Sequence, residues 1–170
     1  MLAQLVMQEP SGPTLEAART VYAAAFGQPP YREGPEQVAA FVDRVRRYAR
    51  ERDGLRLVLV DDDGPAGLGL AVLARPGDWW RDRAAETVGP QQAERWMPSP
   101  CLEIVHVAVH PERQRKGIGR LVHDLLIAGT PAPTAILSCN PEAEPARRLY
   151  AQRGWRVLAG GAALLMGRDL

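Results

Sequence analysis

Apolar positions recur along the chain with two periods, one typical of strands and one typical of helices. Short apolar runs predict strands at Leu2–Met7, Leu55–Val60, Ala66–Ala74, Leu102–Val109 and Thr134–Cys139, and a final hairpin with strands at Trp155–Ala159 and Ala162–Met166. Apolar residues three and four apart predict helices at 15–26, 35–48, 118–126 and 142–153. The resulting order, β-α-α-β-β-β-α-β-α-β-β, indicates an α/β fold.

The stretch Leu102–Leu126 is the most informative part of the chain. Its strand is apolar at nearly every position, as expected where both faces are covered, and Pro111 ends it because proline has no N–H for the ladder. The N–H groups of the next helix's first turn have no partners within that helix, and its dipole attracts anions. Gly117 and Gly119 let a ligand approach the backbone closely. We therefore predict a site for a phosphate or pyrophosphate here.

Two features of this stretch and its surroundings resemble the GNAT acetyltransferases. Gln114–Gly119 reads QRKGIG and fits the family's [Q/R]-x-x-G-x-[G/A] signature, and the order of elements resembles the family's core from end to end. The resemblance implies one domain over 1–170 with the GNAT fold, a mixed central β-sheet flanked by helices, and an insertion at about 75–100. Its parallel fourth and fifth strands would splay apart and receive the pantetheine arm of acetyl-CoA. A dinucleotide fingerprint fits less well because no third glycine follows, and no P-loop motif occurs.

The resemblance also implies which residues bind acetyl-CoA. Backbone groups of the fourth strand would position the thioester, and an amide of Val107 or Ala108 would polarise its carbonyl. The loop amides would hold the pyrophosphate, with added charge from Arg113, Arg115 and Lys116. The full set of predicted cofactor-binding residues is Val107, Ala108, Val109, Gln114, Arg115, Lys116, Gly117, Ile118, Gly119, Arg120 and Asn140.

Tyr150 is the predicted catalytic acid. It lies in ARRLYAQRGW, which resembles the family segment A-x-x-[L/F]-Y-x-x-x-G-[F/W], where the tyrosine hydroxyl points at the sulfur of CoA. A tyrosine on an apolar helix face is also a common core residue, so both interpretations stay open. The family often has asparagine six or seven residues earlier, where this chain has Glu144 and Ala143; Asn140 is then the predicted contact to pantetheine.

Glu103 is the predicted general base. It precedes Gln114 by eleven residues, as the catalytic glutamate does in histone-type GNAT enzymes, and burial would raise the pKa of its carboxyl group. The alternative is a structural glutamate hydrogen-bonded to a neighbouring strand. His106 faces the opposite side of the strand, where a hydrogen-bonded core histidine is expected and a base acting through water is the other option. An acyl-enzyme on Cys139 is disfavoured because no activating base is evident.

Composition restricts the class of partner. The net charge is +1, which gives no field to recruit nucleic acid or an anionic membrane. Two cysteines make neither a disulfide framework nor a zinc site, and Asp61–Asp63 suits a hairpin turn better than a calcium loop, so no metal is expected. No apolar run is long enough to span a membrane, and Met1–Met7 lacks the basic start of a signal peptide. We expect a cytoplasmic protein, and the near absence of lysine beside many arginines hints at a bacterial source.

The segment Arg75–Pro100 is expected to be an insertion with a short helix within 86–97. It holds three of the four tryptophans, which either pack the insertion onto the body or, for Trp79 or Trp80, line an acceptor pocket. One face of the helix predicted at 35–48 is interpreted as solvated, because it carries Asp43, Arg44, Arg46, Arg47 and Arg50. Nothing in these segments identifies an acceptor.

These observations predict an acetyl-CoA-dependent N-acetyltransferase. The acetyl group would move to a primary amine of a small molecule or a protein, by direct attack in a ternary complex. The alternative is an acyl-CoA-binding sensor or interaction module without turnover. The oligomeric state is left open, with a homodimer through the last hairpin as one option.

Overall fold

A computed structural model describes the backbone of residues 2–170 and the side chains of residues 6–170. The described strands form a seven-stranded mixed sheet in the order β1-β2-β3-β4-β5-β7-β6. The chain divides into two compact units, Met1–Val72 with His106–Ala128, and Leu73–Val105 with Gly129–Leu170. Strand β4 (Cys101–Val109) contributes residues to both units, and each unit is described separately below.

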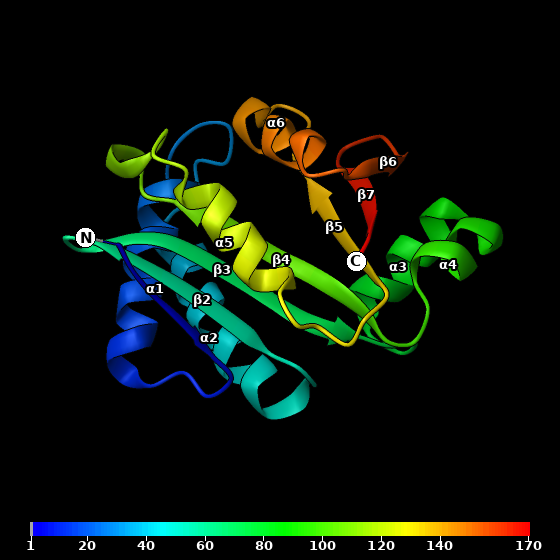
Figure 1. Cartoon of the computed structure of the whole chain (residues 1–170), viewed down its shortest axis with the longest axis horizontal. Coiled ribbons are helices and arrows are strands. Elements are labelled where there is room, and N and C mark those ends of the chain that lie inside the picture. The colour runs from blue at the N-terminus through cyan, green and yellow to red at the C-terminus, as the bar shows by residue number, and fades with distance from the viewer. Residues whose placement is uncertain (1) are drawn as a thin grey trace. The chain divides into compact units, whose positions relative to one another are not determined.

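The first unit holds three antiparallel strands and the end of β4, covered by helices on both faces (Figure 1). Its strands are β1 (Leu2–Met7), β2 (Arg56–Asp62) and β3 (Pro65–Ala74), the last of which extends beyond the unit. Helices α1 (Gly12–Phe26) and α2 (Pro35–Glu51) lie on one face, and α5 (Ile118–Ile127) lies on the other. The predicted apolar stripes of α1 and α2 are buried, with Val21, Phe41 and Val45 fully inaccessible.

Helix α5 packs unusually close to β3 because glycines face it. A methyl group built at Gly67 would lie 2.6 Å from Ile118 Cγ2, and one at Gly69 would lie 2.7 Å from Val122 Cγ1. Both distances are shorter than carbon atoms tolerate, so no side chain fits at either position without movement of the helix. The two glycines therefore set the height of α5 above the sheet, and with it the position of the loop that precedes α5.

We expect Gly67→Ala to lower the free energy of unfolding by about 1–3 kcal/mol, the usual cost of overpacking a well-filled core. Chemical denaturation of the two proteins measures the difference. Gly12→Ala is the matched control, because a methyl group there meets nothing within 4 Å. Equal stability of Gly67→Ala and wild type would show that α5 can move away from β3 at no cost.

The second unit joins the start of β4 to three further strands. Strand β5 (Thr134–Cys139) runs parallel to β4, with Leu102 opposite Ala135 and Glu103 opposite Ile136. Strand β7 (Leu164–Asp169) is antiparallel to β5 and to β6 (Arg156–Ala159), which confirms the predicted final hairpin. Helix α6 (Glu144–Gln152) connects β5 to β6. The predicted parallel pairing of the fourth and fifth strands is thus confirmed.

The insertion holds two helices, α3 (Trp79–Val88) and α4 (Pro90–Trp96), where the sequence analysis predicted one. The short helix predicted within 86–97 is confirmed as α4, and α3 is a further helix that the sequence analysis did not predict. Gly89, at φ +84°, separates the two. Trp96 is buried and Trp80 packs partly against the same core cluster, as the packing interpretation expected. Trp79 is 75% exposed.

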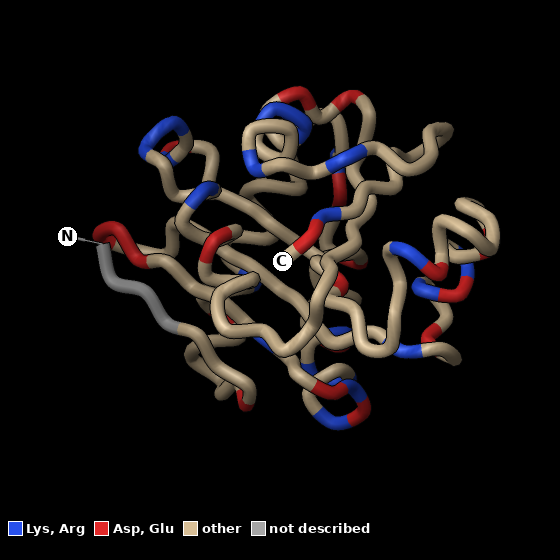
Figure 2. Tube along the Cα trace, turned by 45° about the vertical axis from the view of Figure 1, so that its right-hand side comes forward, with Lys and Arg blue, Asp and Glu red and all other residues tan. Residues whose placement is uncertain are grey.

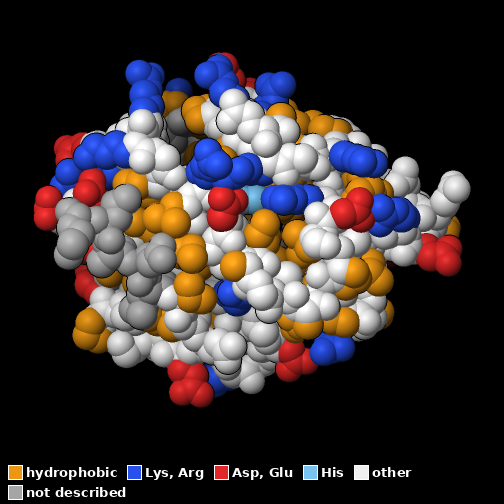
Figure 3. Space-filling view, viewed as in Figure 1, with side chains coloured by type: hydrophobic (Ala, Val, Ile, Leu, Met, Phe, Trp, Pro, Cys, Tyr) orange, Lys and Arg blue, Asp and Glu red, His pale blue; other side chains and the backbone are white. Residues whose placement is uncertain are grey.

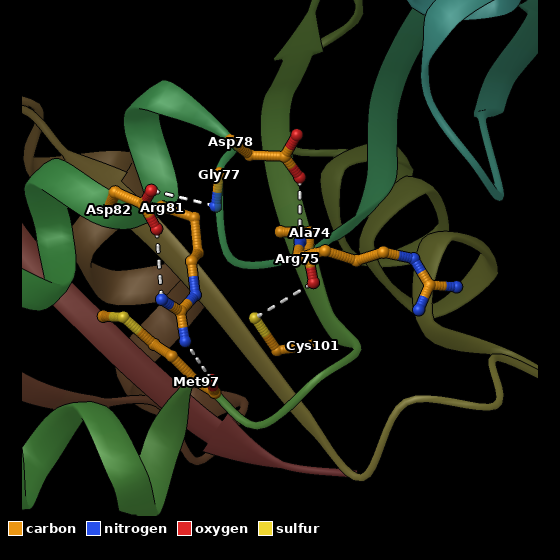
Figure 4. A network of polar contacts seen from close by, with 8 residues as sticks. All are labelled: Ala74, Arg75, Gly77, Asp78, Arg81, Asp82, Met97 and Cys101. Carbon is orange, nitrogen blue, oxygen red and sulfur yellow. Dashed lines mark hydrogen bonds and ion pairs between the residues drawn. The ribbon is translucent and has the colours of Figure 1, made fainter.

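Polar contacts hold the insertion in shape (Figure 4). The Arg81 guanidinium donates to the Met97 carbonyl at 2.7 Å and to the Asp82 carboxylate at 3.1 Å. That carboxylate also accepts from the Gly77 amide at 2.9 Å. Arg81 therefore ties the start of α3 to the end of α4. Among the helices of the described chain, none is long and apolar enough to cross a membrane.

Candidate active site

The loop between β4 and α5 belongs to the first unit and has a defined conformation. The His110 amide donates to the Ala66 carbonyl at 2.8 Å, which fixes the end of β4 against β3. A short 3-10 helix, η1 (Pro111–Arg113), follows. Gly117 then takes the left-handed conformation at φ +81° and becomes the N-cap of α5. Glycine adopts this conformation without strain, which explains the residue type at this position.

The first turn of α5 presents its backbone amides at this loop. The first backbone hydrogen bond of the helix runs from the Leu121 amide to the Gly117 carbonyl at 3.0 Å. The amides of Ile118, Gly119 and Arg120 therefore have no partner within the helix. In the described chain no side chain caps this end, and a methyl group built at Gly117 meets nothing within 4 Å. Amides with this orientation and open space suit a phosphate or diphosphate.

The basic side chains of the loop are partly engaged by the turn between β2 and β3. Lys116 Nζ lies 3.0 Å from Asp62 Oδ2, and Arg113 donates to the Asp63 carbonyl at 3.4 Å. The hydrogen bond from Lys116 lowers the pKa of Asp62. Figure 2 shows the charged residues of the loop and the turn in blue and red, and Figure 3 shows Lys and Arg side chains at the surface. Lys116 and Arg115 are both exposed, and Lys116 also links the loop to the turn through Asp62.

The acidic turn is a hairpin turn, as the sequence predicted. Asp61 Oδ1 accepts from the Gly64 amide at 3.1 Å, and Asp63 takes the left-handed conformation at φ +54°. Within the residues that the structure describes, no group of His, Cys, Asp and Glu side chains has the arrangement of a metal site.

His106 on β4 lies in an aromatic cluster from α1 and α2. Its ring centroid is 5.2 Å from that of Tyr22, 5.5 Å from that of Phe26 and 5.6 Å from that of Phe41. Arg44 Nη1 lies 3.0 Å from His106 Nε2. Because a guanidinium only donates, Nε2 accepts and the ring proton lies on Nδ1.

Burial, and next the positive charge of Arg44, lowers the pKa of His106 to about 3. The ring is therefore neutral at physiological pH, and its accessible nitrogen is already engaged. The hydrogen bond to Arg44 and the lowered pKa favour the first of the two interpretations from the sequence, a structural, hydrogen-bonded histidine.

The low pKa of His106 makes stability depend on pH in a defined direction. An unfolded histidine has a pKa near 6.5. Below that pH the imidazole is protonated in the unfolded chain but stays neutral in the folded chain, so protonation favours the unfolded state. Stability is therefore lost as the pH falls from about 6.5 toward 3. We expect wild type to lose about 2 kcal/mol more than His106→Gln between pH 7 and pH 5. Denaturant titrations at both pH values measure this, and parallel losses in the two proteins would contradict it.

The predicted acid and base both lie in the second unit. Tyr150 is 6% exposed near the end of α6, and its ring meets Trp155 edge-on with centroids 5.8 Å apart. Glu103 is 4% exposed on β4, next to β5. Buried carboxylates and phenols of this kind are common in both active sites and structural networks. Their catalytic roles remain predictions.

Cys139 is the last residue of β5, and Asn140 follows it. Asn140 Oδ1 accepts from the Glu142 amide at 2.8 Å and shapes the turn into α6, so its predicted contact to pantetheine would use its amide nitrogen. Burial raises the pKa of the Cys139 thiol, and burial also raises the pKa of Cys101, to about 12. Thiols with raised pKa values are poor nucleophiles at neutral pH.

A groove of about 340 Å³ lies in the second unit between α6 and the β6–β7 hairpin. Its walls are mainly apolar and include Ala151, Val157 and Met166. None of the predicted site residues lines it, so it adds nothing to the candidate active site.

Sequence reasoning missed Arg44 as an individual residue. It was included in a solvated arginine face, but it is half-buried and bonded to His106. The available signal was its spacing, since Arg44 follows the buried Phe41 by three residues and so lies beside the apolar stripe of α2. Tyr22, which donates to Glu33 Oε2 at 2.6 Å, was interpreted only as part of the apolar stripe of α1.

Comparisons with solved structures identify the fold. Protein PH1933 of Pyrococcus horikoshii is similar with a TM-score of 0.70 and 17% identity, covering 100% of this chain and 99% of that one. The PaiA N-acetyltransferase of Thermoplasma acidophilum in complex with coenzyme A gives 0.67 and 11%, covering 99% of each chain. The ribosomal-protein-S18-alanine N-acetyltransferase of Escherichia coli gives 0.62 and 15%, covering 98% of this chain and 94% of that one.

Sequence comparison gives the family directly. No curated protein matches the chain. The model of the acetyltransferase (GNAT) family matches residues 16–155, which include β4, the following loop, α5 and the predicted acid Tyr150. The protein is therefore a member of the GNAT acetyltransferase family.

Proposed function

We propose that this protein is an acetyl-CoA-dependent N-acetyltransferase that acetylates a primary amine by direct attack in a ternary complex. The observation that carries the proposal is the start of α5, where the amides of Ile118, Gly119 and Arg120 have no helical partner and Gly117 leaves open space. Family membership supports the same assignment. In this proposal the amides of Gln114–Arg120 bind the diphosphate of acetyl-CoA.

The backbone of Val107–Val109 would position the thioester. This segment lies in the same unit as Gln114–Arg120, which we call the diphosphate loop. An amide of Val107 or Ala108 would donate to the carbonyl oxygen as negative charge develops on it. Asn140 would contribute a contact to the pantetheine arm. No metal is needed for this chemistry.

Glu103 would accept the proton of the attacking ammonium group, which leaves a neutral amine as the nucleophile. The nitrogen forms a bond to the carbonyl carbon, and the bond from that carbon to sulfur breaks. Tyr150 would give its hydroxyl proton to the departing thiolate, and the proton that the nitrogen loses as it becomes an amide would return to the Tyr150 oxygen. The products are then an N-acetylated amine and CoA with a free thiol, with the first proton of the ammonium group on Glu103. The first two helices and the insertion would select the acceptor.

Calorimetry with acetyl-CoA, ATP and NAD tests the cofactor, and CoA release in the presence of a panel of amines tests the reaction. We expect saturable binding of acetyl-CoA alone, followed by CoA release that depends on an amine. Preference for ATP or NAD would overturn the proposal. Tight binding of acetyl-CoA without turnover on any amine would instead identify a sensor or interaction module.

A further inference from the structure

Arg44 stands out among the arginines of α2 because its side chain is half-buried, whereas Arg46, Arg47 and Arg50 are exposed. Arg46 pairs with Asp43 and is 57% exposed, and the Arg47 guanidinium lies over the ring of Tyr48 at the surface. Arg44 is half-buried, and its partner among the described residues is the neutral ring of His106. Among the described residues Arg44 bonds to a neutral ring and makes no ion pair with a carboxylate, so its remaining donors suit an anion from outside, to which they would form stronger hydrogen bonds.

The geometry of this arginine suits a carboxylate. One of its nitrogens is engaged by His106, which fixes the plane of the guanidinium and leaves its other nitrogens for a ligand. A planar fork of donors matches the two oxygens of a carboxylate. The positive charge of Arg44 and the negative charge of Glu33 both act on Tyr22, so the cluster has one charge of each sign. A single cation beside a carboxylate favours a monoanionic ligand over a phosphate.

The cluster lies beside the segment of β4 that we propose positions the thioester, within the same unit. His106 is the residue before Val107, whose backbone is assigned to the thioester, and successive α-carbons are about 3.8 Å apart. Tyr22, Phe26 and Phe41 surround His106 and supply an apolar wall. Tyr31 meets Phe26 edge-on, with ring centroids 4.9 Å apart, and extends the cluster.

We propose that the acceptor is an amine that also carries a carboxylate, as a free amino acid does, and that Arg44 binds this carboxylate. The inference rests on the proposed acetyltransferase function and makes it specific. Glu33 supplies the negative charge that suits the ammonium form of the same ligand, and the aromatic rings suit an apolar side chain. Arg44 is thereby a specificity-determining residue that acts on the acceptor and not on acetyl-CoA.

Matched pairs of acceptors test this proposal, each pair with the same side chain and with or without the carboxylate. Phenylalanine with phenethylamine, and leucine with isoamylamine, are suitable pairs for a CoA-release assay. We expect wild type to favour the carboxylate member by at least tenfold in kcat/KM. Arg44→Gln should abolish this preference by raising KM for the amino acid at least tenfold, with an unchanged Kd for acetyl-CoA.

Arg46→Gln is the matched control, because it removes an exposed arginine two residues away on the same helix and should keep the preference. Thermal unfolding and the Kd for acetyl-CoA establish that Arg44→Gln is folded. Amine turnover without a preference for the carboxylate, or a preference that survives in folded Arg44→Gln, overturns this proposal and leaves the acetyltransferase function standing. Binding of acetyl-CoA without turnover of any amine overturns both.

Discussion

Gly117→Val is expected to weaken acetyl-CoA binding by at least tenfold, about 1.4 kcal/mol, in calorimetric titrations. Gly117 is the N-cap of α5, and the space beside its α-carbon holds no protein atom within 4 Å. A valine side chain would fill the space that we assign to the diphosphate. Its backbone strain at φ +81° would also turn the first amides of α5 away from the ligand.

Gly129→Val separates the loss of the site from the effect of strain. Gly129 also has a left-handed backbone, at φ +67°, and also has no atom within 4 Å of a built methyl group. It lies after the end of α5, outside the diphosphate loop. We expect similar destabilisation in the two variants and normal acetyl-CoA affinity in Gly129→Val alone. Normal acetyl-CoA affinity in a folded Gly117→Val protein would contradict the assignment of the diphosphate to this loop.

Tyr150→Phe is expected to lower kcat about 100-fold while the Kd for acetyl-CoA stays within about threefold of wild type. General acid catalysis contributes at least this much to comparable reactions, and the ring without its hydroxyl still fills the buried position beside Trp155. Steady-state CoA release gives kcat, and calorimetry gives the affinity.

Tyr48→Phe is the control for loss of a tyrosine hydroxyl, since Tyr48 lies on α2 next to the guanidinium groups of Arg47 and Arg52 and has no assigned role. Its kcat should equal that of wild type. A normal kcat in Tyr150→Phe would show that Tyr150 is only a core residue and that another group gives the proton to the thiolate.

Much of the fold could be predicted from local patterns. The strand at Thr134–Cys139 has the predicted bounds, and the helix after Gly117 starts where its glycine N-cap indicated. These elements follow from apolar periodicity and from residues that begin or end them, which are properties of neighbouring positions. The loop between β4 and α5 was predictable for the same reason, since its position between a strand and a helix is local; its role in binding a diphosphate stays a prediction.

The remaining features depend on contacts between distant residues. Helix α3 has a weak apolar pattern, and a tryptophan pair at its start gives little helical signal. The partners of Lys116 and Arg44 are Asp62 and His106, which lie 54 and 62 positions away in sequence. Periodicity carries no information on such pairs, so Lys116 was predicted only as a charge near the cofactor and Arg44 only as part of a solvated helix face.

A crystal structure with bound CoA tests the central claim most directly. The account predicts density for the diphosphate at the start of α5, with phosphate oxygens about 2.7–3.2 Å from backbone nitrogens of the segment Gln114–Arg120. Density for CoA bound elsewhere, with these nitrogens facing only solvent or packed side chains, would contradict it.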